Sequence, residues 1–178
     1  MSRAHWLPRE QMEHILAFCM RENREALRLS LDYGMRIGDV LRMPTDAARR
    51  GRWSFKEEKT GKRRRITLSR AHRVECLSIA GKIYVFEHRL DPHKHRTRQA
   101  VFKDLKRIAR FFGAKDISPH TARKIYAVER FKGSDLKRVQ KLLNHSDEAV
   151  TYLYALADIL SPSSRAPRKS SPPIQLDD

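Results

Sequence analysis

The chain lacks the long apolar segments that membrane insertion or secretion requires. No apolar run in its 178 residues approaches the roughly 20 residues that a membrane-spanning helix needs. The N-terminus, MSRAHWLPREQ, has no apolar core of the kind that a signal peptide carries. The sequence therefore predicts neither a membrane-spanning protein nor a secreted one.

Cysteine is scarce, and metal-ligand patterns are weak. The two cysteines, Cys19 and Cys76, are far apart and lack metal-type spacing. We expect them to be buried thiols in a reducing, intracellular compartment. Three histidines in EHRLDPHKH, namely His88, His93 and His95, have no cysteine or acidic partner at metal spacing. We therefore expect no metal ion and no cofactor.

Acidic residues are outnumbered by basic ones. The chain has 38 Lys and Arg against 21 Asp and Glu, which gives a net charge of +17. Such an excess favours a polyanionic partner. Composition alone leaves three classes of partner open: nucleic acid, a membrane surface and acidic proteins.

Hydrophobic periodicity predicts a mostly helical domain with one small antiparallel sheet, an α+β fold. Helices are expected over 8–19, from near Asn23 to Gly34, and over 35–43, 70–80, 96–112, 119–131, 134–143 and 146–160. The segment KIYVFEH, 82–88, predicts a short strand. The Ser- and Pro-rich residues 161–178 predict a disordered tail. Residues 1–160 are then expected to form a single domain with its own core.

The segment RWSFKEEKTGKRRRITLS, 52–69, predicts a β-hairpin. Trp53 and Phe55 alternate with polar residues before the turn, and Ile66 and Leu68 do so after it. Thr60-Gly61 supplies the turn chemistry. If the partner is a nucleic acid, we expect the basic side chains of this hairpin to lie against phosphates.

The chain also carries the residue types that side-chain attack on a phosphodiester requires. The transition state gathers negative charge on the non-bridging oxygens. Arginine binds that charge best, because its guanidinium is planar, permanently charged and bidentate. A nucleophile, a proton acceptor and an acid for the leaving oxygen are also needed. The candidates are Arg36, Lys59, His120, Arg123, His145 and Tyr154.

Two of these candidates precede the middle of the chain. Arg36 stands at the start of a predicted helix in YGMRIGD, where backbone N–H groups favour an anion. Asp39, three residues later, is spaced to form an ion pair with it. Lys59 occupies the predicted hairpin turn in EKTGK, which favours it over Lys56 and Lys62 in the same run.

The other four candidates follow in the second half. His120 and Arg123 in PHTAR are three residues apart, so they share one helix face. His145 precedes Tyr154 by nine residues. Tyr152 would lie about 200° from Tyr154 around a helix, so the two tyrosines cannot share a face.

Taken in order, YGMRIGD, KTGK, HTAR, LLNH and the tyrosine nine residues later resemble the motifs of the tyrosine recombinases, also called phage-type integrases. The resemblance covers roughly residues 5–158. It departs from the family at Asn144, where Gly is usual, and at Ala122, where Leu is common. The resemblance implies the tyrosine recombinase/integrase catalytic-domain fold and a DNA recombination or integration enzyme that acts on double-stranded DNA.

The family chemistry implies a covalent step. Tyr154 would attack the scissile phosphate and form a 3′-phosphotyrosyl link, with release of a 5′-hydroxyl. Lys59 would protonate the leaving oxygen, and His120 would assist proton transfer at the nucleophile. This assignment makes Tyr154 the nucleophile, while Tyr152 packs elsewhere or lies on the surface.

The remaining candidates would hold the phosphate. Arg36 and Arg123 would bind its non-bridging oxygens, and His145 would donate a hydrogen bond to it. Because the tyrosyl ester conserves the phosphoryl energy, rejoining would need no ATP. Because arginines bind the charge, the resemblance implies no metal.

The resemblance also implies a cellular and oligomeric setting. We expect a cytoplasmic protein, associated with the nucleoid or, if phage-encoded, present in the host cytoplasm. Recombination in the family implies a homotetramer on DNA, with a monomer in isolation. The core-binding domain that precedes the catalytic domain in most members is expected to be absent. Alternative functions are a type IB topoisomerase-like or telomere-resolving strand transferase, and a catalytically inactive DNA-binding relative.

Overall fold

The structure is a computed structural model that describes residues 7–132. In chain order its elements are α1 (Arg9–Ala17), α2 (Arg21–Tyr33), α3 (Ile37–Leu41), α4 (Thr45–Arg50), β1 (Arg52–Lys56), β2 (Arg63–Thr67), α5 (Arg70–Ile79), α6 (Arg98–Phe111) and α7 (Pro119–Lys132). Among these described elements no helix has the length and apolar character to cross a bilayer. The arrangement is mostly helical with one two-stranded sheet, as the sequence predicts.

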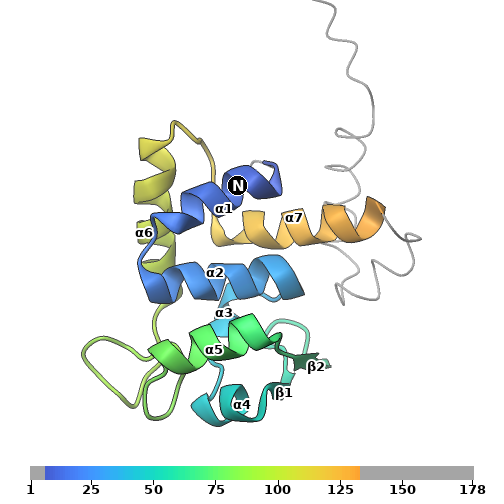
Figure 1. The fold of residues 1–178 in the computed structure, drawn as a ribbon, viewed down its shortest axis with the longest axis vertical. Coiled ribbons are helices and arrows are strands. Elements are labelled where there is room, and N and C mark those ends of the chain that lie inside the picture. Colours follow the sequence, from blue (N-terminus) through green and yellow to red (C-terminus); the bar gives the residue numbers. More distant parts are fainter. Residues whose placement is uncertain (1–6, 133–178) are drawn as a thin grey trace, which may run out of the picture.

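The helix α2 lies at the centre of the helical body (Figure 1). It contacts α1, α3, α5, α6 and α7, and Figure 1 shows it between α1 and α7 on one side and α5 on the other. Leu27, Leu29 and Leu31 are all fully buried. Because residues two apart on a helix point in nearly opposite directions, their common burial requires neighbours on several sides of α2.

The end of α2 is fixed by a close approach to α7. Gly34 caps the helix with a left-handed backbone, φ 62°, which glycine adopts without strain. A Cβ atom at this position would lie 2.3 Å from Cδ1 of Tyr126 in α7. Both the positive φ and the contact with Tyr126 therefore require glycine at this position. The close packing fixes the direction in which the chain leaves α2, two residues before Arg36.

The hairpin has the register that its alternation predicts. β1 and β2 pair antiparallel, with Trp53 opposite Ile66 and both side chains buried. Gly61 in the turn has φ 66°, which explains the need for glycine there. Cations occupy the exposed face, and Lys56 stands directly opposite Arg63.

Residues 82–88 do not form the predicted strand. The segment makes isolated bridges only, Tyr84 with Pro44 and Glu87 with His95. Val85 and Phe86 are consecutive and both fully buried. Two consecutive buried side chains are compatible with an irregular segment that is enclosed by the core on both sides. The apolar content of the sequence alone could not distinguish such a segment from a strand.

The start of α2 and the segment after Pro44 also differ from expectation. α2 begins at Arg21, and Asn23 does not cap it. The amide of Asn23 is instead buried and donates a hydrogen bond to Asp104 of α6 at 2.8 Å. The short helix α4 was not predicted, because TDAARR has almost no apolar periodicity.

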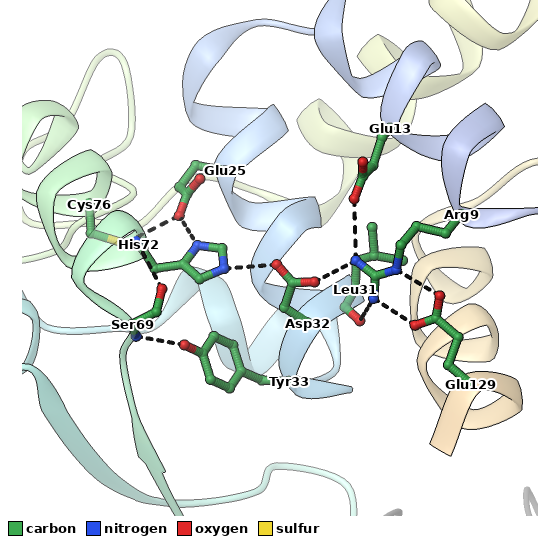
Figure 2. A network of polar contacts seen from close by, with 10 residues as sticks. All are labelled: Arg9, Glu13, Glu25, Leu31, Asp32, Tyr33, Ser69, His72, Cys76 and Glu129. Atoms are coloured by element: carbon green, nitrogen blue, oxygen red, sulfur yellow. Dashed lines mark hydrogen bonds and ion pairs between the residues drawn. The ribbon is translucent and has the colours of Figure 1, made fainter. Parts of the chain in front are cut away.

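A polar network joins α5 to α2 (Figure 2). The ring of His72 bonds to Glu25 through Nδ1 at 2.6 Å and to Asp32 through Nε2 at 2.8 Å. Burial opposes a charge on this ring, but the hydrogen bonds to Asp32 and Glu25 outweigh it and raise the pKa of His72 to about 9. The ring is therefore an imidazolium at neutral pH, and both nitrogens donate.

The same network continues from α2 to α1 and α7. The guanidinium of Arg9 donates to Asp32 at 2.6 Å, to Glu13 at 3.3 Å and to both oxygens of Glu129 at 2.7 Å. Figure 2 shows Asp32 between His72 and Arg9. One continuous chain of charges therefore ties four helices together.

Candidate active site

A cavity of about 440 Å³ brings together three of the predicted catalytic residues, Arg36, Lys59 and His120. They come from the start of α3, the hairpin turn and the start of α7. The complete lining is Arg36, Ile37, Gly38, Asp39, Glu58, Lys59, Arg98 and His120. Arg36 and His120 therefore line one site although they are more than 80 residues apart in sequence.

Arg36 is held by a buried carboxylate. It is the N-cap residue of α3 and is 9% exposed. Its Nη1 donates to Oε2 of Glu57 at 2.9 Å, and Glu57 is itself buried. Burial alone would raise the pKa of Glu57, but the Thr60 hydroxyl and the Arg36 charge lower it below its usual range. Glu57 is therefore a carboxylate, and it orients the guanidinium of Arg36.

A second arginine shares Glu57. Arg64 of β2 donates to Oε1 of Glu57 at 3.2 Å. It also donates to the backbone carbonyls of Tyr33 and Gly34 at the end of α2. The hairpin is thereby attached to the segment that leads into Arg36, which fixes the hairpin turn relative to α3.

Asp39 attaches the hairpin turn from the other side. Within the described residues it pairs with Arg42 rather than with Arg36, the partner expected from the sequence. Its Oδ1 also accepts a hydrogen bond from the backbone N–H of Glu58 at 3.0 Å. Asp39 is 1% exposed. It therefore supports the backbone next to Lys59, and Glu57 takes the role at Arg36.

Lys59 lies where the turn prediction placed it. It lines the cavity, whereas Lys56 and Lys62 of the same basic run do not. The hairpin turn is closed by two backbone hydrogen bonds, from Glu57 to Lys62 at 3.0 Å and from Gly61 to Glu57 at 2.9 Å. Of the three lysines in this run, Lys59 is thus the one that lines the cavity.

His120 and Arg123 differ in their exposure. His120 is exposed and lines the cavity. Arg123, one turn further along α7, is 1% exposed and is among the largest fully buried side chains. Arg123 is not among the residues that line the cavity, so the structure brings three of the predicted residues to the cavity wall and leaves Arg123 buried in α7 behind His120 in sequence.

The sequence matches a known protein family over most of its length. The chain matches the phage integrase family over residues 5–159. It belongs to this family.

Two curated relatives show the extent of the likeness. Tyrosine recombinase XerD of Rhizobium meliloti is 32% identical over 133 residues, which covers 68% of this chain and 42% of that protein. Tyrosine recombinase XerD of Agrobacterium fabrum is 32% identical over 160 residues, which covers 74% of this chain and 48% of that protein. The chain thus spans less than half the length of these relatives.

Solved structures of the family have the same fold. A lambda integrase(75-356) dimer bound to a COC′ core site is similar, with a TM-score of 0.70 at 20% identity over 99% of this chain and 64% of that chain. XerH site-specific recombinase, in a post-cleavage complex with a palindromic difH substrate, has a TM-score of 0.66 at 19% identity over 88% of this chain and 51% of that chain. The predicted integrase catalytic-domain fold is confirmed.

Two predicted site residues of this integrase-family chain, His145 and Tyr154, lie outside the described residues, as do the predicted helices over 134–143 and 146–160 and the predicted tail. Their roles stay predictions. Among the described residues no group of three metal-ligating side chains is present, so His88, His93 and His95 form no such group.

Two residues at the site were missed from the sequence, Glu57 and Arg98. Glu57 and Glu58 are adjacent and chemically identical, yet one is buried under Arg36 and the other is exposed. Alternation along β1 was a usable signal, because it places Glu57 on the same face as Trp53 and Phe55. Arg98 had no such signal, since its approach to α3 is a purely tertiary contact.

Proposed function

We propose that this chain is the catalytic domain of a tyrosine-type site-specific recombinase, with residues 1–160 as the domain. It cleaves and rejoins double-stranded DNA through a 3′-phosphotyrosyl intermediate at Tyr154. The observation that carries the proposal is the convergence of Arg36, Lys59 and His120 on one cavity in a chain of the phage integrase family.

The described residues suit the early steps of this reaction. A DNA phosphate in the cavity would contact Arg36. The guanidinium of Arg36 is oriented by Glu57, whose Oε2 accepts a hydrogen bond from Nη1 of Arg36 at 2.9 Å. Arg36 and Arg123 would bind the non-bridging oxygens, where preorganised cations lower the barrier most. His120, exposed at the start of α7, would assist proton transfer at the Tyr154 hydroxyl.

Departure of the 5′ oxygen needs a proton. Lys59 would supply it, and its place in the cavity lining supports this role. His145 would donate a further hydrogen bond to the phosphate. The ester that remains on Tyr154 is then attacked by a 5′-hydroxyl, which restores the DNA and frees the tyrosine.

The comparisons support a DNA partner and assembly on it. Two of the similar structures are a lambda integrase dimer bound to a COC′ core site and a lambda integrase tetramer bound to a Holliday junction. The net charge of +17 provides long-range attraction to such a polyanion. A homotetramer on two duplexes is the state that we propose for recombination, in the cytoplasmic compartment that holds the DNA.

Covalent trapping tests the proposal. A pool of nicked duplexes with randomised flanks should leave a protein–DNA adduct that survives denaturation. Tyr154→Phe should abolish the adduct, whereas Tyr152→Phe, the matched control two residues away, should leave it unchanged. Adduct from Tyr154→Phe at the wild-type level would refute the assignment. A gel shift without any adduct would indicate an inactive DNA-binding relative.

A further inference from the structure

Arg98 is a cation in the cavity that none of the proposed roles uses. It is the first residue of α6, directly after the N-cap Thr97, whose hydroxyl accepts a hydrogen bond from Ala100 at 3.1 Å. The cap fixes the backbone from which the Arg98 side chain leaves. That side chain lines the same cavity as Arg36, Lys59 and His120.

The guanidinium of Arg98 lies against the first turn of α3. A Cβ atom added at Gly38 would be 3.3 Å from Cδ and 3.6 Å from Nη1 of Arg98. The same Cβ would be 3.5 Å from Oε2 of Glu58. Gly38 therefore leaves room for the Arg98 side chain two residues after Arg36, at the wall of the cavity.

The charge of Arg98 is not used by the protein in the part that the structure describes. Arg64 faces Glu57, and Arg42 faces Asp39. Arg98, by contrast, makes no side-chain hydrogen bond or ion pair within the described residues, although Glu58 is close by. It is also exposed. An unpaired guanidinium in a cavity is preorganised for a bidentate anion such as a phosphate.

We propose that Arg98 binds the DNA phosphate next to the one that is cleaved. The inference rests on the proposed function and extends it. Arg36 and Arg123 already account for the two non-bridging oxygens of the scissile phosphate, so a third arginine is available for its neighbour. Arg98 holds the substrate strand in register in the cavity, so that the scissile phosphate stays on Arg36.

Chemical footprinting tests the contact without requiring catalysis. Phenylglyoxal, which modifies exposed arginines, is applied to Tyr154→Phe protein with and without saturating random-sequence duplex, and labelled sites are found by mass spectrometry. Labelling of Arg98 should be lost on addition of DNA, and labelling of the exposed Arg110 at the other end of α6 should persist. Equal labelling of Arg98 in both samples would overturn the proposal, whether or not the protein forms an adduct.

Trapping kinetics test the consequence. Arg98→Ala should slow adduct formation by roughly 10- to 100-fold, the range of one charge-assisted hydrogen bond. Arg98→Lys should recover part of the loss, and Arg110→Ala, which removes the same charge from the same helix, should stay within about twofold of wild type. Thermal unfolding of Arg98→Ala should match wild type, because no described partner is lost. Equal losses for Arg98→Ala and Arg110→Ala would reduce Arg98 to a general surface charge and refute the proposal.

The position of the contact has its own test. Once the adduct identifies the cleaved linkage, the adjoining phosphate is replaced by a neutral methylphosphonate. On this duplex the Arg98→Ala penalty should disappear, because the two changes remove the same interaction. A penalty of undiminished size would show that Arg98 binds elsewhere. Absence of wild-type adduct refutes the proposed function instead, and the footprint then decides on Arg98 alone.

Discussion

Two groups of charged side chains in this molecule have opposite ratios of positive to negative charge. Beside the cavity, the arginines Arg36 and Arg64 both form ion pairs with the carboxylate of Glu57. In the network between the helices, the single cation His72 lies between two carboxylates, Glu25 and Asp32 (Figure 2). Basic side chains are in excess at the first group, and acidic side chains are in excess at the second.

We interpret the first group as part of the proposed binding site and the second as part of the scaffold. In the helix network, Arg9 adds a second cation and each charge has partners within the protein. Such a group gains nothing from an external ion. At the cavity, Lys59 and Arg98 add positive charge beside the carboxylates Asp39 and Glu58, and the function that we propose brings a DNA phosphate to this site. We therefore expect the local ratio of charges to indicate the substrate site better than the total charge of the chain does.

The largest effect is expected when the carboxylate that Arg36 and Arg64 share is neutralised. Glu57→Gln keeps the shape but leaves Arg36 and Arg64 without their shared charge. Loss of one partner of a buried ion pair costs about 3–5 kcal/mol, so the free energy of unfolding should fall by that order in urea titrations. Adduct formation should also fall, because Arg36 loses its orientation.

A control for Glu57→Gln is the next residue along the chain. Glu58 is exposed and forms no ion pair within the described part, so Glu58→Gln should change the free energy of unfolding by less than about 0.5 kcal/mol. Similar destabilisation by both substitutions would mean that the buried pair contributes no more than surface charge does.

The contribution of the helix network to the free energy of unfolding should depend on pH. The pKa of His72 is raised to about 9 in the folded protein, against about 6.5 in the unfolded chain. Its stabilisation is therefore fully present below pH 6.5 and is lost as the pH rises through 9. A shift of this size corresponds to roughly 3 kcal/mol.

Unfolding in urea at a series of pH values from 6 to 10 measures this loss. An NMR titration of the His72 ring in the wild-type protein gives the folded pKa directly, even if substitutions at this position fail to fold. A ring that titrates near 6.5 would show that Glu25 and Asp32 do not stabilise the imidazolium, and the contrast between the two groups would then fail.

Much of this fold was predictable because its elements have strong local patterns. The apolar stripe of α6, with Val101, Leu105 and Ile108 buried, and the cross-strand pair Trp53–Ile66 appear as predicted. Segment 82–88 was misassigned because burial there depends on what surrounds it, and not on a repeating pattern. Local sequence predicts elements well where one face is buried and poorly where the whole segment is enclosed.

The site divides along the same line. Arg36, Lys59 and His120 each stand in a short motif with a recognisable backbone position, so the sequence made them candidates, and all three line one cavity. Glu57 contacts Arg36, and Arg98 lies beside Gly38 of α3, and no local motif predicts either contact. Positioning residues of this kind can be found only when the elements are placed relative to one another.

The smallest effect is expected at the exposed end of the helix network. Glu129→Gln removes a carboxylate that binds Arg9 at 2.7 Å, but both side chains are more than a quarter exposed. Arg9 keeps Asp32 and Glu13. Solvent screening limits such a pair to about 1 kcal/mol or less, so the urea midpoint should shift only slightly, and less at high salt.

The same substitution sharpens the comparison through catalysis. Glu129 is on α7, the helix that carries His120 and Arg123, but it faces Arg9 and not the cavity. Adduct formation by Glu129→Gln should therefore match wild type, while Glu57→Gln is impaired. A large loss of adduct at unchanged stability would show that the network sets the position of α7 at the cavity, and the separation of scaffold from site would be wrong.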